Sequence, residues 1–285
     1  MKHKLLKFLA ILLTFVLLIA GCLFYAIYIS PEKLTLKYET ISSKQIPASL
    51  DNVTVGYFSD IYYLEFMNEK RLEKMINVIN DANVDVILFG GDLFANAQDE
   101  KISADVINKL TTLFTKMDAP LGKFFVLGDK DCVTSDTRTL VSTIFYNAGF
   151  EDLSNKNTKL HNGNEESVTL VGLDNIINGS MDVQTAFNGT SSESFNILFT
   201  HTPDSVSTLT TDVVDLAIAG HSLGGQLRIP IIGSFDHVEG AEKYNYGTYT
   251  FNKTTVSVSN GMGTHGSDMR LFCPPQFNIF VLHKK

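Results

Sequence analysis

The stretch Val84-Asp85-Val86-Ile87-Leu88-Phe89-Gly90-Gly91-Asp92 is the best single guide to the fold of this chain. Its first six residues are almost wholly apolar, which is typical of a parallel strand that is covered on both faces. The run ends at two glycines and a carboxylate, so we expect Asp92 at the carboxyl end of a buried strand. Side chains at such ends converge on one edge of an α/β sheet.

Strands and helices are predicted to alternate on both sides of this stretch. Further strands are expected over residues 53–58, 124–127, 168–173, 195–199, 214–219 and 277–282, with a hairpin over 246–251 and 254–259. Apolar residues recur at 3.6-residue spacing over 68–82, 103–117 and 136–148, which predicts amphipathic helices. We therefore predict one α/β domain over residues 53–285, in which helices cover two mixed sheets packed together.

The N-terminal residues are predicted to lie outside this domain. Lys2, Lys4 and Lys7 form a short tail, residues 1–7, before an uncharged run over residues 8–29. That run is as long as the roughly 20 apolar residues that a helix needs to span a bilayer. Lysines before a single span place the tail in the cytoplasm, and a stalk (residues 30–52) and the domain on the outer face of the plasma membrane.

A lipoprotein signal is the alternative interpretation of this segment. Ile19-Ala20-Gly21-Cys22 resembles such a signal, with Cys22 as the lipidated first residue after cleavage. The apolar run continues well beyond Cys22, further than a signal peptide requires, and this favours an uncleaved anchor.

The composition restricts the class of protein. Of the 285 residues, 44% are hydrophobic, which is enough for a sizeable core. The net charge of −8 argues against nucleic acid as a partner. Only Cys132 and Cys273 lie beyond the N-terminal segment, so a disulfide-dependent scaffold is excluded and two partly buried thiols are expected.

Four other segments place polar residues at the ends of predicted strands. They are Ser59-Asp60-Ile61-Tyr62, Gly128-Asp129-Lys130-Asp131, Thr200-His201-Thr202-Pro203 and Gly220-His221-Ser222-Leu223-Gly224-Gly225-Gln226. Carboxylates and imidazoles are the ligands that hold two divalent cations about 3.5–4 Å apart in phosphoester hydrolases. The five segments together predict a site of this kind.

In this order the segments resemble the motifs of the calcineurin-like metallophosphoesterases, which run D-x-H, G-D, G-N-H-D/E, H and G-H-x-H. The string from Gly220 to Pro230 resembles G-H-T-H-G-G-Q-x-R-x-P of the membrane-anchored bacterial branch of that family. Asn260-Gly-Met-Gly263 and the segment from Arg270 to Pro275 look like the closing segment of that branch. The resemblance implies a β-sandwich of two mixed sheets flanked by helices, preceded here by one transmembrane helix.

The resemblance also implies a metal-binding role for five residues. Asp92 matches the carboxylate that bridges both metals, and Asp60 matches a ligand of the first metal. His201 and His221 match ligands of the second metal, and Asp129 replaces an asparagine ligand there.

The chain departs from the family pattern at three histidines. Tyr62 and Leu223 stand where the two histidines of the first metal should be, and Lys130 replaces the histidine of the third motif, which Asp131 would support. A phenol, with a pKa near 10, binds metal well only after losing its proton. We therefore expect the first site to be empty and the second to hold one Mn, Zn or Fe ion, with no two-metal centre.

Two functions follow from these losses. The first is a protein whose phosphoester hydrolysis is lost or strongly reduced, with a binding or regulatory role at the cell envelope and no catalytic residue assigned. The alternative is an active mononuclear phosphoesterase acting on a phosphodiester or a lipid-linked pyrophosphate. Either one would bind a phosphorylated or lipid-linked ligand. Lys130 is hypothesised to neutralise crowded carboxylates, and His265 is a candidate for substrate contact.

Overall fold

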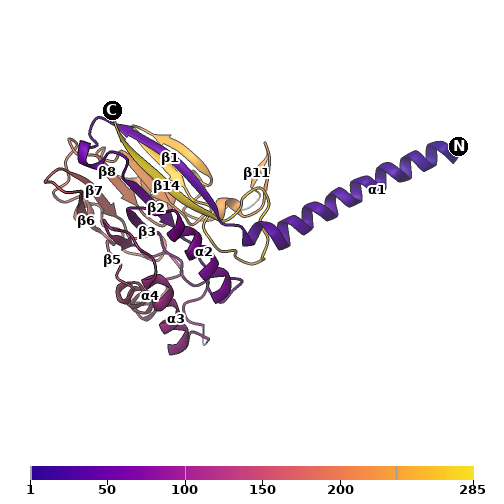
Figure 1. Cartoon of the computed structure of the whole chain (residues 1–285), viewed down its shortest axis with the longest axis horizontal. Coiled ribbons are helices and arrows are strands. Elements are labelled where there is room, and N and C mark those ends of the chain that lie inside the picture. The colour runs from indigo at the N-terminus through magenta and orange to yellow at the C-terminus, as the bar shows by residue number, and fades with distance from the viewer. Residues whose placement is uncertain (1, 100, 235–236) are drawn as a thin grey trace.

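A computed structural model of the chain describes residues 2–99, 101–234 and 237–285 (Figure 1). Met1, the first residue of the predicted tail, lies outside the described residues. The helices are α1 (Lys2–Phe24), α2 (Glu69–Asp81), α3 (Ala104–Thr115), α4 (Ser135–Asn147) and α5 (Val183–Ala186). The strands are β1 (Thr35–Ser43), β2 (Thr54–Phe58), β3 (Val86–Phe89), β4 (Lys123–Phe125), β5 (Glu151–Asp152), β6 (Lys156–His161), β7 (Ser167–Gly172), β8 (Asn196–Phe199), β9 (Leu216–Ala219), β10 (Arg228–Ile229), β11 (Gly233–Ser234), β12 (Gly247–Phe251), β13 (Thr254–Val258) and β14 (Gln276–Lys284).

Two six-stranded sheets form the body of the domain. The first has the order β1-β14-β2-β3-β4-β5 and the second the order β12-β13-β9-β8-β7-β6. In the first sheet β14 runs antiparallel to β2, while β2, β3, β4 and β5 are parallel. In the second sheet the parallel strands β13, β9, β8 and β7 are flanked by antiparallel β12 and β6. The predicted pair of mixed sheets is therefore confirmed.

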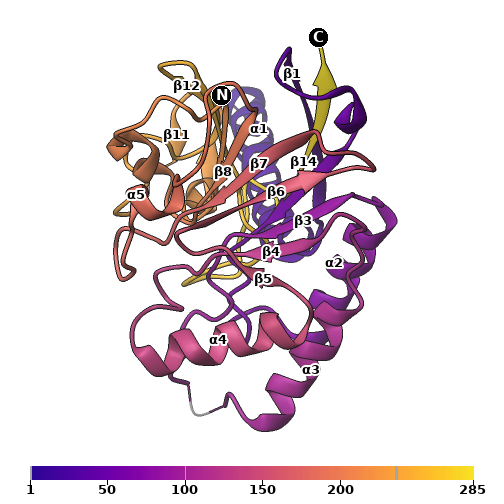
Figure 2. The same ribbon diagram turned by 90° about the vertical axis from the view of Figure 1, so that its left-hand side faces the viewer.

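The apolar sequence of β3 is explained by burial on both of its faces. Val86 and Leu88 pack between the two sheets, whereas Ile87 and Phe89 face the layer of helices. The helices α2, α3 and α4 cover this outer face (Figure 2). Phe145 of α4 stacks on Phe89 at a centroid distance of 4.1 Å. Successive side chains of a strand point to opposite faces, so burial on both faces requires an unbroken apolar run.

The three predicted amphipathic helices are confirmed, and a side chain caps the N-terminus of each. The Asn68 side chain accepts a hydrogen bond from the backbone N–H of Arg71, and Ser103 caps α3 in the same way. Thr134 and Thr137 form a reciprocal capping box at the start of α4. Such caps satisfy backbone N–H groups that have no partner in the first turn of a helix.

The stalk predicted over residues 30–52 does not stand apart from the domain, because β1 within it belongs to the first sheet. Within it, β1 pairs in parallel with β14 along its full length, from Thr35 beside Gln276 to Ser43 beside Lys284. β1 is an edge strand, and its residues are half-buried or exposed. Its sequence is therefore mixed and polar, and its partner lies at the other end of the chain, so local patterning gives no signal.

The α1 helix projects from the domain, and none of its residues is buried (Figure 1). The helix continues through a π-helical turn over Tyr25–Ile29, and Ala26 and Ser30 are buried against the domain. By length and composition the helical segment Lys2–Glu32 could cross a membrane, as predicted for residues 8–29. A signal sequence has the same properties, so the alternative at Cys22 stays open.

Candidate metal centre

The five predicted ligand residues follow five parallel strands that share one end of the sandwich. Asp60, Asp92 and Asp129 follow β2, β3 and β4 of the first sheet, and His201 and His221 follow β8 and β9 of the second. Asp60, Asp92 and His221 have positive φ angles of 54°, 60° and 66°. Non-glycine residues held in this region are strained and often belong to functional sites.

Two glycines allow the strand ends to approach closely. Gly91 has a φ of 94°, and a Cβ atom on it would overlap the backbone nitrogen of Gly128. A Cβ atom on Gly128 would in turn overlap the carboxylate of Asp92. The Asp131 carboxylate fastens the same two loops by accepting N–H hydrogen bonds from Asp92 at 2.7 Å, Leu93 at 3.1 Å and Gly128 at 2.9 Å. The sequence predicted that Asp131 would support a side chain, whereas it holds the backbone of the site.

Four of the five predicted ligands come together in a buried cluster. One ligand atom from each of Asp92, Asp129, His201 and His221 lies within 4.8 Å of the others. The Nε2 atom of His201 lies 3.1 Å from Oδ1 of Asp129 and 3.4 Å from Oδ2 of Asp92. The Nδ1 atom of His221 lies 3.1 Å from the same oxygen of Asp129. Two carboxylates and two imidazoles are a suitable set for Zn, Mn or Fe.

The other nitrogen of each imidazole determines how the ring faces the cluster. Nδ1 of His201 lies 2.7 Å from the carbonyl oxygen of Gly90, and Nε2 of His221 lies 2.7 Å from that of Glu239. A carbonyl oxygen only accepts, so both of these nitrogens carry hydrogen. In the neutral rings, the inward nitrogens then present lone pairs to each other at 3.0 Å. Such an arrangement needs a cation or a proton between the rings, and partners of this kind commonly orient metal-binding histidines.

The electrostatics of the protein without metal agree with this geometry. Burial alone would lower the pKa of His201, but the charges of Asp92 and Asp129 outweigh it and raise the pKa well above its usual 6.5. Burial alone would raise the pKa of Asp129, but hydrogen bonds from His201 and His221 hold that pKa below its usual range. A proton on His201 therefore takes the place that a metal cation would fill, and a cation that binds must displace it.

Asp60 lies beside this cluster and outside it. Its carboxylate accepts hydrogen bonds from the Ser59 hydroxyl at 2.5 Å and from the backbone N–H of His221 at 3.0 Å. Burial raises the pKa of Asp60 above its usual value. Asp60 thus helps to position the His221 backbone, and its role as a ligand of the first metal stays a prediction.

Tyr62 and Leu223 take the space where the first metal's histidines were expected. The Tyr62 hydroxyl lies 3.2 Å from Oδ2 of Asp92 and 3.4 Å from Oδ1 of Asp60, and it donates to these carboxylates. Burial, followed by the charges of Asp92 and Asp60, raises the pKa of Tyr62 well above 10. In the protein without metal the phenol is therefore a neutral donor. Leu223 is buried and contributes no polar atom.

Lys130 forms an ion pair with a carboxylate of the cluster, as the hypothesis that it neutralises crowded carboxylates requires. Its Nζ lies 2.5 Å from Oδ2 of Asp129, and its backbone N–H donates to Oδ1 of Asp92 at 2.9 Å. Burial alone would lower the pKa of Lys130, but the charge and hydrogen bond of Asp129 raise it. The ammonium group is partly exposed and faces the open side of the site.

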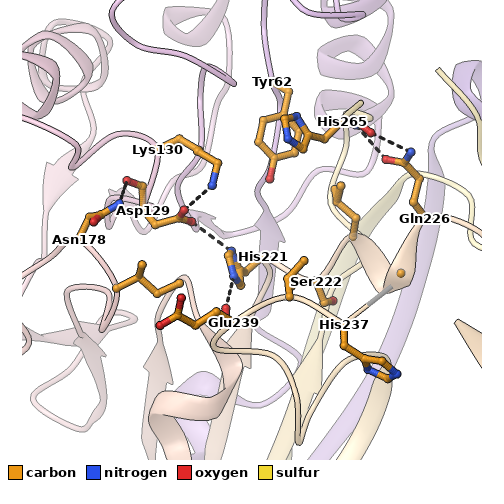
Figure 3. A pocket seen from close by; sticks show the side chains of 14 residues that line it. Tyr62, Asp129, Lys130, Asn178, His221, Ser222, Gln226, His237, Glu239 and His265 are labelled. Carbon is orange, nitrogen blue, oxygen red and sulfur yellow. Dashed lines mark hydrogen bonds and ion pairs between the residues drawn. The ribbon is translucent and has the colours of Figure 1, made fainter. Parts of the chain in front are cut away.

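A cavity of about 540 Å³ opens in front of the cluster (Figure 3). Its wall includes Asp129, Lys130 and His221 together with Asn178, whose amide donates to the backbone carbonyl of Asp129 at 3.1 Å. This volume is within the range of sites for small ligands. A small molecule bound in the pocket would therefore contact the ammonium group of Lys130 and the metal-binding cluster at the same time.

The pocket is also lined by residues outside the metal cluster, of which the sequence predicted only one, His265, as a contact for substrate. His265, the predicted substrate contact, lines the pocket with its ring 5.2 Å from that of Tyr62 and its Nδ1 2.8 Å from a Glu65 oxygen. His237, which belongs to none of the five motif segments, also lines the pocket. Glu239 was not singled out, because it acts through its backbone carbonyl, which carries no side-chain signal.

A family model of the calcineurin-like phosphoesterases matches residues 53–224, which is more than half of the chain. The chain belongs to this family. The matched region contains all five predicted ligand residues and ends beside the Leu223 position. Calcineurin-like phosphoesterases require divalent metals, and the buried Asp and His cluster is where this member could hold one.

Relatives in the family extend the similarity beyond that region. An uncharacterised metallophosphoesterase of Bacillus subtilis, YkuE, is 28% identical, with 90% of this chain and 88% of that protein covered. A transmembrane protein with a metallophosphoesterase domain from Danio rerio is 26% identical over 85% of this chain, which spans only 56% of that protein. UDP-2,3-diacylglucosamine pyrophosphatase LpxG of Chlamydia muridarum is 24% identical, with 81% of this chain and 84% of that protein covered.

Proposed function

We propose that the protein is a membrane-anchored phosphoesterase that works with a single divalent cation. The observation that carries this proposal is the convergence of Asp92, Asp129, His201 and His221 within 4.8 Å, with both imidazoles oriented by backbone carbonyls. A site that no longer binds metal does not require its two imidazoles to be oriented in this way. The cluster therefore favours the mononuclear alternative over the expectation that hydrolysis is lost.

The four residues of the cluster would hold one Mn, Zn or Fe ion. A bound divalent cation would supply Lewis acidity, polarising a phosphoryl oxygen and making water more acidic. Asp60 would keep the His221 backbone in place through its hydrogen bond to that N–H. The Tyr62 hydroxyl would hold the Asp92 carboxylate in the orientation that the centre needs.

Lys130 is the residue best placed to act on a phosphorylated ligand. Its ammonium group lies on the pocket wall, is partly exposed, and is held by Asp129. An ammonium group at this place attracts a phosphate and stabilises negative charge on a departing oxygen. The Asn178 amide fixes the Asp129 backbone and so maintains the position of that ion pair.

The substrate class that we propose is a phosphodiester or a lipid-linked pyrophosphate. Support for the lipid-linked pyrophosphate comes from the LpxG relative, which is named as a pyrophosphatase of a diacylated sugar nucleotide. Support for membrane anchoring comes from the apolar α1 helix and from the transmembrane relative. We further propose that α1 is an uncleaved single span with residues 2–7 in the cytoplasm and the domain on the outer face of the plasma membrane.

A binding or regulatory role without hydrolysis is the second candidate. Its support is the apolar side chain of Leu223 and the neutral phenol of Tyr62, which provide no imidazole ligand where the family has the two histidines of the first metal. A single cation cannot clamp both the attacking and the leaving oxygen as a pair of cations does. The two candidates differ in one measurable property, which is turnover at one bound metal per chain.

The test uses the full chain in detergent, stripped of metal and reloaded with one equivalent of Mn²⁺. Hydrolysis of bis(4-nitrophenyl) phosphate is followed, and bound metal is measured by elemental analysis. We expect turnover that depends on the cation and is lost in Asp92→Asn, while His283→Gln, an exposed residue beside Asp51, serves as the matched control and keeps it. One bound equivalent without turnover of this diester or of a diacylated nucleotide pyrophosphate would favour the binding role.

A further inference from the structure

The β10–β11 hairpin (residues 228–234) exposes a run of apolar side chains. We call Ile229, Pro230, Ile231 and Ile232 the hairpin tip. The side chains of Ile231 and Ile232 are 107% and 70% exposed, and Phe272 beside the hairpin is 56% exposed. A continuous patch of exposed large apolar residues on a folded domain usually marks a contact with a partner or a membrane.

The position of the hairpin identifies the partner. The hairpin stands beside the base of α1, on the side of the domain from which that helix departs (Figures 1 and 2). Backbone hydrogen bonds connect the two: Arg270 N–H donates to Ala26 O of the helix end at 2.9 Å, and Arg228 N–H donates to Leu271 O at 2.9 Å. The hairpin is thus fixed relative to the point where the apolar helix enters the domain.

The end of α1 has the composition of a membrane interface. Tyr25 and Tyr28 are 42% and 65% exposed on the last turns of the helix, and such aromatic side chains gather at the level of lipid head groups. If α1 spans the bilayer, the membrane surface lies at this turn, next to the hairpin tip. An apolar segment at this level buries its side chains about 5–10 Å into the boundary between head groups and acyl chains.

Residues that flank the hairpin in the chain line the pocket. Gln226, two residues before β10, and His237 and Val238, which follow the hairpin in the chain, all line the cavity in front of the metal cluster. Contact of the tip with the membrane would therefore place the mouth of the pocket close to the head groups.

We infer that the hairpin tip is a second membrane contact that dips into the outer part of the bilayer beside α1. The inference rests on the proposed anchoring by α1 and is independent of hydrolysis. Its consequence for the site is a preference for phosphorylated head groups of lipids that reach the pocket from the bilayer. The partner is a lipid surface, and a protein partner or a second copy of the chain at the tip is an alternative that the test excludes or reveals.

The test exploits the absence of tryptophan from this chain. The full chain with Ile231→Trp is reconstituted into vesicles of phosphatidylcholine and phosphatidylglycerol, with and without bromine on the acyl chains. The matched control is Tyr146→Trp, a 74% exposed position on α4, remote from α1 (Figure 1). We expect the Ile231→Trp emission to be shifted to shorter wavelength and quenched by brominated lipid, with no quenching in the control.

Flotation of the vesicles tests the anchoring by α1 separately from the membrane contact of the hairpin tip. Protein that does not float with the vesicles contradicts the anchoring by α1. Protein that floats, with an Ile231→Trp emission that is the same in brominated and plain vesicles, overturns the membrane contact of the tip. A short-wavelength emission that bromine does not quench also overturns it and assigns the tip to a protein interface. Ile232→Trp repeats the measurement at a neighbouring exposed position in case the first substitution changes the hairpin.

Discussion

Replacing His201 should remove most of the stabilisation that a metal ion gives to the fold. His201 is fully buried, and its Nε2 supplies one of the four clustered ligand atoms. At a free cation concentration 100 times the dissociation constant, a site present only in the folded state adds about 2.7 kcal/mol to stability. In a domain of this size each kcal/mol corresponds to about 2–4 °C, so Mn²⁺ should raise the Tm of the parent protein by roughly 5–10 °C.

The His201→Gln variant keeps an amide N–H that can reach the carbonyl of Gly90 and lacks the imidazole lone pair. Loss of a group that only supports a ligand weakens metal binding about 10–100-fold, so loss of a ligand itself should reach at least the upper value. At the same Mn²⁺ concentration the stabilisation then falls to about 0.4 kcal/mol, or roughly 1 °C. The measurement is thermal unfolding followed by circular dichroism with and without Mn²⁺. His283→Gln on β14 is the control and should respond like the parent. An undiminished Tm shift in His201→Gln would refute the four-ligand centre.

Four further predictions concern the same pocket. Tyr62→Phe removes a hydrogen-bond donor from buried carboxylates and should cost about 1.5–3 kcal/mol in the metal-free protein, measured by urea unfolding; an unchanged midpoint contradicts the assigned contact. Tyr62→His combined with Leu223→His should raise bound Mn²⁺ from one to two per chain by elemental analysis, and a count that stays at one shows that the pocket lacks room. Because its pKa is raised, protonated His201 stabilises the metal-free fold at low pH, and this stabilisation is lost as the pH rises through that pKa. A metal ion must displace the same proton, so the affinity for Mn²⁺ should increase with pH. Calorimetry in two buffers should detect the proton that is released. Lys130→Ala should destabilise the metal-free protein, because the Asp129 charge loses its partner; a more stable variant would refute the neutralising role of the ammonium group.

The elements that sequence predicted well are those whose burial is reflected in local pattern. β3 is buried on both faces and reads as an apolar run, and α2 is buried on one face and reads as a 3.6-residue repeat. β1 has neither property, since it is a half-exposed edge strand whose partner β14 lies more than two hundred residues away in the chain. Its membership in the sheet depends on that long-range pairing, which no local window contains.

The same distinction applies to the site. The order of the five strand-end segments was enough to predict the residues that converge, because parallel strands bring their carboxyl ends to one edge. It could not separate Asp60 from the other four, since that depends on where each carboxylate points. The backbone carbonyls of Gly90 and Glu239, which orient the two imidazoles, are equally invisible in the sequence. Every residue has a backbone carbonyl, so only the folded structure shows which carbonyls lie within hydrogen-bond distance of the imidazoles.

The charges around the pocket give a physical reason for a single cation. Three buried carboxylates, those of Asp60, Asp92 and Asp129, face this region together with the ammonium group of Lys130. One divalent cation and that ammonium group would offset the negative charge of these carboxylates, which buried charges require. A second divalent cation would also need a ligand at the position of Leu223, whose side chain has no atom to coordinate it. The ammonium group of Lys130 therefore supplies fixed positive charge beside Asp129, at the edge of the cluster that would hold the single cation.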